Sequence, residues 1–203
     1  MNLVNKKLLL KLYSTSYSLD IWPLAFKYYG SIEILMPLRN HTVEFYSDDH
    51  LLVDSVAAFI QKGDAAIVIC TPSHKSLLEK KIGNSISCQY FDAEETLAKF
   101  MIGKQPDAER FNKVVGSIVE ASLEKHKDVR AFGEMVAILW DRGNAGGALL
   151  LEELWNDLLR KNEFSLHCAY PEQSFDSRRA KHDIDHVCNA HTASTLSNIT
   201  FIT

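Results

Sequence analysis

The chain has 203 residues, of which 46% are apolar and 24% are charged, and its formal net charge is -4. These values suit one soluble domain with an appendage, and the length allows a sizeable core. The weakly acidic composition excludes a broad nucleic-acid surface, and no apolar run approaches the roughly 20 residues that span a bilayer. We therefore expect neither nucleic acid nor a membrane as a direct partner.

The four cysteines lack the C-x-x-C spacing of common metal and redox motifs. Cys70, Cys88 and Cys168 lie in apolar, strand-like runs, which favours reduced, buried thiols. The N-terminus has a basic start and a short apolar patch, but Lys11 interrupts the patch and no small-residue cleavage site follows. We therefore expect a cytoplasmic protein without a signal peptide.

Residues 1–40 differ from the rest of the chain, because they are rich in Tyr, Leu and Ser and lack a clean period. Two interpretations are open. Either Met36 is the natural start and 1–35 is an upstream extension of the reading frame, or the segment is a helix that packs on the domain. The expected organisation is an N-terminal extension over 1–40, one domain over 41–192 and a C-terminal tail over 193–203.

From residue 41 onward, short apolar runs alternate with amphipathic segments. The expected strands cover 42–46, 65–70, 86–91, 129–132 and 164–170. The expected helices cover 51–62, 72–81, 93–101, 106–125, 135–140, 144–160 and 177–190. This alternation predicts a three-layer α/β fold, with a mainly parallel sheet and helices on both faces.

Helix-start signals follow several of these strands. Thr71 stands before Pro72, which matches an N-cap followed by proline at the first helical position. Asp92 and Glu95 form a capping box, and Asn144 precedes another expected helix. Capping is therefore the main role expected for Thr71 and Asp92.

The stretch Val129–Trp140 has the features of a ligand site. An apolar strand ends at Gly133, the carboxylate of Glu134 follows, and a helix begins. Open α/β sheets place ligands at the carboxyl ends of their strands. A carboxylate directly after a buried strand is costly unless a partner pairs with it, so Glu134 is the best candidate for function.

The carboxyl ends of parallel strands share one edge of the sheet, so other polar and aromatic residues should gather near Glu134. These expected ligand-binding residues are Tyr46, Thr71, His74, Asp92 and Tyr170. Two interpretations of His74 remain open. It is either an exposed helix residue or the partner of Glu134, as acid, base or hydrogen-bond donor.

The densest local group of possible metal ligands is His182, His186, Cys188 and His191. His182 and His186 are four residues apart and share a helical face, and all four side chains can bind zinc. Their spacing matches no standard zinc signature. The group is either a metal site or a surface helix whose Cys188 faces the core, and we expect no metal or cofactor.

Standard catalytic motifs are missing from the sequence. There is no serine nucleophile elbow, H-E-x-x-H motif or dinucleotide fingerprint. His167 and Cys168 are adjacent on an expected strand, so their side chains point to opposite faces and cannot form a nucleophilic pair.

A series of residues, taken in order and spacing, resembles one known family. They are His41, Phe45-Tyr46, Asp92-Ala93, Phe132-Gly133-Glu134-Met135, Leu151-Glu152, Leu154-Trp155-Asn156, Cys168-Ala169-Tyr170-Pro171, Cys188 and His191. Over about 41–192 the chain resembles the MEDS domain, the DcmR-type sensory domain of methanogens and methylotrophs. The resemblance implies a module that senses small ligands, alone or fused to histidine kinases or transcription regulators, and it adds His41 to the expected ligand-binding residues.

This family also resembles RecA-like ATPases of the circadian-clock type, which implies a phosphate-binding loop after the first strand. Here that segment reads Tyr46-Ser47-Asp48-Asp49-His50, without Gly or Lys and with two carboxylates that repel a triphosphate. Thr71-Pro72-Ser73-His74 stands where such ATPases carry acidic residues. ATP hydrolysis is therefore not expected from this RecA-like, degenerate P-loop fold.

The function expected from the sequence is a stand-alone sensory or signalling domain. A small ligand or a partner protein binds at the carboxyl edge of the sheet, with Glu134 and Tyr46 as the best contacts. The signal passes to a partner in transcription or two-component signalling, or through homo-oligomers. One alternative is an enzyme or nucleotide-binding protein with Glu134 as general base, and another is a zinc-stabilised interaction module.

Overall fold

The computed structural model describes residues 41–175, 180–196 and 199–202, so the expectations for residues 1–40 lie outside it. The strands are β1 (His41–Tyr46), β2 (Ala65–Cys70), β3 (Ser87–Asp92), β4 (Met101–Ile102), β5 (Gln105–Pro106), β6 (Val129–Gly133), β7 (Phe164–Pro171), β8 (Ala193–Leu196) and β9 (Ile199–Ile202). The α-helices are α3 (Asp49–Ile60), α4 (Pro72–Ile82), α5 (Ala93–Ala98), α6 (Ala108–Phe111), α7 (Ser117–Leu123), α8 (Met135–Asp141), α9 (Ala145–Lys161) and α10 (Ala180–Asn189).

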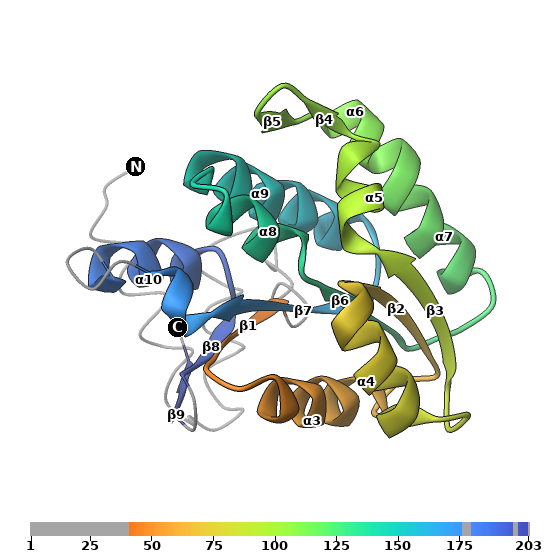
Figure 1. Ribbon diagram of the computed structural model, residues 1–203. Helices are drawn as coiled ribbons and strands as arrows, with labels where there is room; N and C mark the ends of the chain where they lie inside the picture. Colours follow the sequence, from red (N-terminus) through yellow and green to blue (C-terminus); the bar gives the residue numbers. More distant parts are fainter. Residues whose placement is uncertain (1–40, 176–179, 197–198, 203) are drawn as a thin grey trace, which may run out of the picture. The chain divides into compact units, whose positions relative to one another are not determined.

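The main sheet has the strand order β3-β2-β6-β7-β1-β8-β9. The strands from β3 to β1 are all parallel, β8 continues parallel to β1, and β9 returns antiparallel to β8. Helices α3 and α4 cover one face of the sheet, and α5 to α9 cover the other (Figure 1). The expected α/β fold with a mainly parallel sheet is confirmed.

The strand order reverses between β2 and β6. From β2 the chain moves outward through α4 to β3, whereas from β6 it moves the opposite way through α8 and α9 to β7. A reversal of this kind is where open α/β sheets bind ligands. Thr71 follows β2 and Glu134 follows β6, so both residues stand at this switch point.

Strand β2 shows why the sheet is buried on both sides. Ala66, Val68 and Cys70 join the smaller core under α3 and α4, whereas Ile67 and Ile69 join the larger core on the other face. Alternate side chains of a strand point to opposite faces, so a strand between two helical layers must be apolar throughout. The continuous apolar run in the sequence reports this double burial.

Two helices differ from their expected bounds: one ends early, and the other is divided. The helix expected over 93–101 ends at Ala98, and the short β4–β5 hairpin follows, with Gly103 in its turn at a φ of +61°. The helix expected over 106–125 begins only at Ala108, because Asp107 is its N-cap and accepts from the Arg110 N–H at 2.9 Å. A π-helical turn (Asn112–Gly116) then separates α6 from α7.

The C-terminal segment differs from the expected polar tail over 193–203, because β8 and β9 add two strands to the sheet. The N–H and hydroxyl of Thr192 donate to the His41 carbonyl at 2.7 and 2.9 Å. These bonds align the next residues beside β1. The last helix begins at Ala180, and 176–179 lie outside the described residues.

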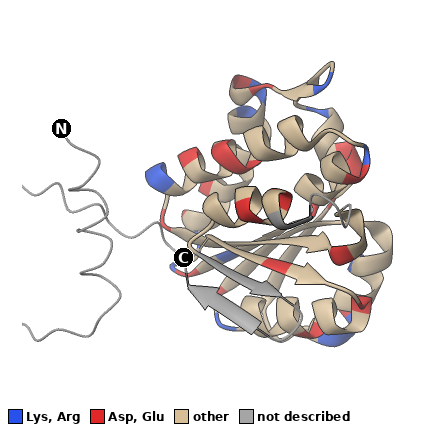
Figure 2. Cartoon of the chain, turned by 90° about the vertical axis from the view of Figure 1, so that its left-hand side faces the viewer, with Lys and Arg blue, Asp and Glu red and all other residues tan. Residues whose placement is uncertain are grey.

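None of the described helices combines the length and the apolarity needed to cross a bilayer. Basic and acidic residues are interspersed over the helices and loops that the structure describes (Figure 2). This mixture agrees with the small net charge of the chain.

Candidate functional site

Glu134 is buried at the switch point, with 3% of its surface exposed, and each of its carboxylate oxygens has a partner. Oε2 accepts from the Thr71 backbone N–H at 2.6 Å, and Oε1 contacts Nδ1 of His74. The Glu134 N–H also donates to the Ile69 carbonyl at 3.0 Å, which ties the end of β6 to β2. The partner that the buried carboxylate requires is therefore present.

His74 connects three elements of this edge. It lies in α4 with 6% exposure, its Nε2 is 3.4 Å from Oδ1 of Asp49 in α3, and its ring meets Tyr46 edge-on at 6.1 Å between centroids. The interpretation of His74 as an exposed helix residue is therefore wrong. We call Tyr46, Thr71, His74 and Glu134 the edge group.

The charges of the edge group shift two pKa values. Burial lowers the pKa of His74, but the hydrogen bonds and charges of Glu134 and Asp49 outweigh burial, so the pKa rises above its ordinary value. Burial raises the pKa of Tyr46, and the charge of Glu134 adds to this effect. The edge group therefore favours the protonated form of His74 beside Glu134 and the neutral form of Tyr46.

The capping predictions for this edge are confirmed. Thr71 accepts from the His74 N–H at 3.5 Å, and Asp92 accepts from the Glu95 N–H at 2.9 Å. The Asp92 carboxylate therefore serves as the N-cap of α5. Asp48 caps α3 through the N–H groups of His50 and Leu51, at 2.8 and 3.1 Å.

The structure places His41 and Tyr170 away from the edge group. His41 is the first residue of β1, so it lies at the opposite end of the strand from Tyr46. Tyr170 is fully buried in the larger core, where it packs against Phe45 and Trp140. His41 instead belongs to a second arrangement, deep under α9, and the Tyr170 hydroxyl donates to one of its members.

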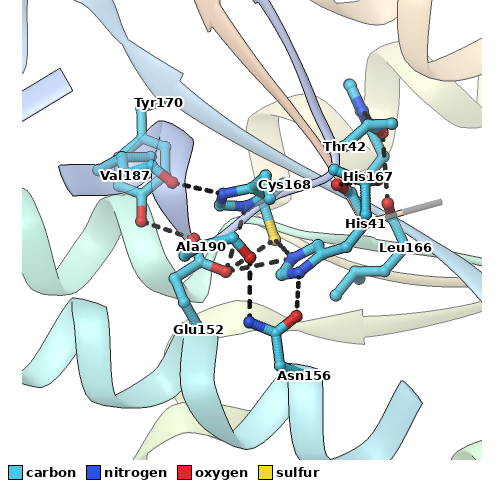
Figure 3. Close-up of polar contacts among 12 residues, drawn as sticks. His41, Thr42, Glu152, Asn156, Leu166, His167, Cys168, Tyr170, Val187 and Ala190 are labelled. Atoms are coloured by element: carbon cyan, nitrogen blue, oxygen red, sulfur yellow. Dashed lines mark hydrogen bonds and ion pairs between the residues drawn. The ribbon is translucent and has the colours of Figure 1, made fainter. Parts of the chain in front are cut away.

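This second arrangement, which we call the buried quartet, consists of His41, Glu152, Cys168 and His191. Figure 3 labels His41, Glu152 and Cys168 among their polar contacts. Their ligand atoms lie within 4.8 Å of one another, and all four residues are buried. Oε2 of Glu152 lies 3.3 Å from Nε2 of His41 and 3.4 Å from Nε2 of His191. The Cys168 sulfur lies 3.5 Å from the same His41 nitrogen and 3.6 Å from Oε2.

Outer partners hold His41, Glu152 and His191 of the quartet in place. Nδ1 of His41 contacts Oδ1 of Asn156 at 2.8 Å, and the amide nitrogen of Asn156 donates to the Ala190 carbonyl at 3.0 Å. Nδ1 of His191 lies 2.7 Å from the Val187 carbonyl. The Tyr170 hydroxyl donates to Oε1 of Glu152 at 2.7 Å.

The electrostatics of the quartet follow from its complete burial. Burial alone raises the pKa of Glu152, but the charges and hydrogen bonds of His191 and His41 outweigh it, so the pKa stays well below its ordinary range. Burial and the neighbouring His191 lower the pKa of His41. Burial, together with the Glu152 charge, raises the pKa values of Cys168 and Tyr170. The centre thus holds a carboxylate beside a neutral thiol and phenol.

The metal group that the sequence suggested is divided between two places. His182 and His186 are exposed on α10, with 3.2 Å between their Nε2 atoms, and Cys188 is half-buried against the larger core. Only His191 belongs to the buried quartet. The core-facing interpretation of Cys188 is the one that the structure supports.

The prediction that His167 and Cys168 face opposite ways is confirmed. His167 contacts Thr42 at 2.8 Å and Glu44 at 3.2 Å on the α3 face of the sheet, whereas Cys168 points toward Glu152 on the α9 face. These two neighbouring residues therefore belong to different polar groups.

A hollow of about 380 Å³ lies elsewhere, between α5, the β4–β5 hairpin and the turn from α8 to α9. Its lining includes Glu94, Leu97, Met101, Lys104, Leu139 and Arg142. Neither the edge group nor the buried quartet contributes to this lining.

Sequence reasoning did not find the quartet, although its four members were among the residues that carried the family resemblance. One signal was available in α9. Glu152 lies four residues after Ala148 and three before Trp155, so it belongs to the buried stripe of an amphipathic helix. A carboxylate on such a stripe requires a partner.

The fold and these two groups define a class of protein: a parallel α/β domain with a carboxylate–imidazole pair at its switch point and a second polar centre under a helix. The chain belongs to the MEDS family, described as the methanogen/methylotroph, DcmR sensory domain, whose family model matches residues 40–192. The resemblance seen in the sequence is thereby confirmed, and it implies a signalling or sensory role. A search of curated proteins gave no match.

Proposed function

We propose that this protein is a sensory domain that binds a small polar ligand at the edge group and passes the signal to a partner protein, without hydrolysing ATP. The partner acts in transcription or two-component signalling, or is a second copy of the chain. The proposal places the domain in the cytoplasm, which the four free cysteines favour. We also propose that the parallel sheet and its helices are of the RecA-like type.

The observation that carries this proposal is the Glu134–His74 pair at the switch point. The pair offers a carboxylate acceptor and an imidazole donor, with the Tyr46 ring beside them. A polar ligand that replaces one contact of the pair would change how α4 is held against β6. Binding would thus alter the packing of a helix, which a partner protein can read.

The same edge argues against a nucleotide. The carboxylate of Asp48 occupies the first free N–H groups of α3, where a P-loop protein would bind phosphate. The alternative of an enzyme with Glu134 as general base is less favoured, because both carboxylate oxygens already accept from or pair with protein groups.

Native mass spectrometry of the protein purified from its own host, before and after denaturation, tests the proposal. We expect a small organic mass that is lost on denaturation. It should be absent from Glu134→Gln and retained in Asp92→Asn, a control carboxylate at the same edge. A nucleotide mass, or a ligand equally retained by Glu134→Gln, would contradict the proposal. A bare chain would favour the partner protein as the ligand of this edge.

A further inference from the structure

We propose that His41, Glu152, Cys168 and His191 hold one divalent transition-metal ion, with zinc as the best fit, as a resident structural centre. No comparison assigns this site, and it does not depend on the function proposed for the edge group. The argument rests on the ligand geometry, the orientation of the two imidazoles, the donor chemistry and the burial of the quartet.

Four of the six distances between the ligand atoms of the quartet match those around a tetrahedral zinc ion. Zinc bond lengths of about 2.0–2.3 Å imply separations of about 3.4 Å between nitrogen and oxygen ligands, and of about 3.6 Å between sulfur and either. The structure gives 3.3 and 3.4 Å for the two nitrogen–oxygen pairs. It gives 3.5 and 3.6 Å for two of the three pairs that include the Cys168 sulfur. The other two of the six pairs, Cys168 with His191 and His41 with His191, lie within 4.8 Å.

The outer partners fix which nitrogen of each imidazole faces the centre. The Val187 carbonyl can only accept, so Nδ1 of His191 carries the proton there. Asn156 donates its amide to Ala190, so its oxygen faces His41 and again accepts from Nδ1. Metal-binding histidines usually have this arrangement, in which the outer nitrogen donates to a carbonyl or carboxylate.

With these orientations, the lone pairs of the two Nε2 atoms and of the Glu152 oxygen point toward the centre of the quartet. In neutral imidazoles with a protonated Nδ1, both Nε2 atoms are acceptors, and both face the Glu152 oxygen, which is also an acceptor. Facing acceptors in a dry interior need a proton or a cation between them. Without a metal, a proton on an imidazole nitrogen meets this need. A metal ion takes the place of that proton, which leaves to solvent, and also binds the adjacent Cys168 sulfur.

The donor set selects the class of metal. Two imidazoles, one carboxylate and one thiolate suit zinc and similar divalent ions, whereas magnesium and calcium prefer shells made of oxygen. On binding, the Cys168 S–H bond breaks, a sulfur–metal bond forms, and the proton leaves to solvent. The ion's two positive charges then balance Glu152 and the Cys168 thiolate, so the buried centre is neutral overall.

The location of the quartet indicates a structural role. Its four side chains come from β1, α9, β7 and the turn after α10, and all four residues are buried. Structural zinc sites use four protein ligands in this closed manner. The ion would therefore fasten the C-terminal segment to the centre of the sheet.

Elemental analysis of the full chain, purified without a metal-affinity tag, tests the site. We expect about one equivalent of zinc per chain and, in competition with a chelator, a loss of at least about tenfold in zinc affinity for Cys168→Ser. Cys70→Ser is the matched control, because Cys70 is another buried strand cysteine outside the quartet and should keep the metal. His182→Ala with His186→Ala should also keep it.

A spectroscopic test covers the case in which Cys168→Ser fails to fold. The parent protein, stripped with a chelator and titrated with cobalt(II), should show tetrahedral d–d bands and a thiolate-to-cobalt charge-transfer band. X-ray absorption of the zinc form should show one sulfur neighbour among nitrogen and oxygen. A parent chain that carries no zinc and gives no such bands would overturn the proposal, as would Cys168→Ser that folds and retains full occupancy.

Discussion

At the scale of single residues, the charged pair of His74 and Glu134 is the feature on which the proposed function depends. The carboxylate comes from the end of β6 and the imidazole from α4, so the pair bridges the switch point. Asp49 contacts the second imidazole nitrogen at 3.4 Å. Both of these acids favour the protonated form of His74.

The stability of the fold should therefore depend on pH through His74. Because its pKa is higher in the folded state than the ordinary value of 6.5, the pair's stabilisation is fully present below about pH 6.5 and is lost as the pH rises through the folded-state pKa. Urea unfolding of the parent and His74→Gln should show a difference in unfolding free energy that is largest below about pH 6.5 and shrinks as the pH rises. The control is Ser76→Ala, at an exposed position of α4 without an ionisable group, and its difference from the parent should not change with pH. If His74→Gln behaves like this control, the pair is not charged.

Tyr170 allows a second test at this scale. Its hydroxyl donates to Glu152 in a fully buried setting, so Tyr170→Phe leaves Oε1 of that carboxylate without its donor. We expect a loss of about 1–3 kcal/mol in the free energy of unfolding, measured by urea denaturation. Tyr90→Phe, at a half-buried position of β3, should cost much less. Equal losses of unfolding free energy in the two variants would mean that the hydrogen bond from Tyr170 to Glu152 does not stabilise the fold.

At the scale of elements, the helices and strands that depend on local signals could be predicted from the sequence, whereas those that depend on tertiary contacts could not. The strands and the starts of α4, α5 and α9 follow from apolar runs and capping residues, which act within a few positions. The β4–β5 hairpin and the π-helical turn were missed. The hairpin is held in part by the side chain of Asn144, which donates to the Lys104 carbonyl from forty positions away, and no local pattern encodes such a contact.

Two glycines should respond in opposite ways to alanine. A Cβ at Gly63, after α3, would lie 2.7 Å from the Asp128 backbone carbonyl, so Gly63→Ala should cost about 1–3 kcal/mol. A Cβ at Gly146, in the first turn of α9, meets nothing within 4 Å, so Gly146→Ala should stabilise by up to about 1 kcal/mol through helix propensity. Thermal unfolding of both variants checks the signs. A neutral Gly63→Ala would show that the loop before β2 moves easily.

At the scale of the whole molecule, the proposed metal connects parts of the chain that are far apart in sequence. If the quartet binds zinc, chelation should lower the free energy of unfolding by about 4 kcal/mol at a zinc concentration a thousandfold above the dissociation constant. Hydrogen exchange should rise in residues 182–192 and at the start of β1, and re-addition of zinc should reverse it. Magnesium is the control ion and should restore nothing. Unchanged exchange after complete metal removal would contradict a fastening role.

The sequence by itself determined the fold class and the family, and it predicted that the buried carboxylate of Glu134 has a partner. These conclusions depend on periodicity, on capping and on one costly carboxylate after a buried strand, all of which are local properties. The sequence also placed Tyr46, Thr71 and His74 at the correct edge, because parallel strands end on the same side of a sheet.

Only the tertiary structure decided that His74 pairs with Glu134 and that His41 and Tyr170 belong elsewhere. His41 pairs in register with Leu166, which places its side chain on the same face of the sheet as Cys168. Helix α9 then lays Glu152 over that face, and the turn after α10 brings His191 to it. Strand register and crossover direction are set by the packing of whole layers, so no local pattern could have shown that these four residues meet.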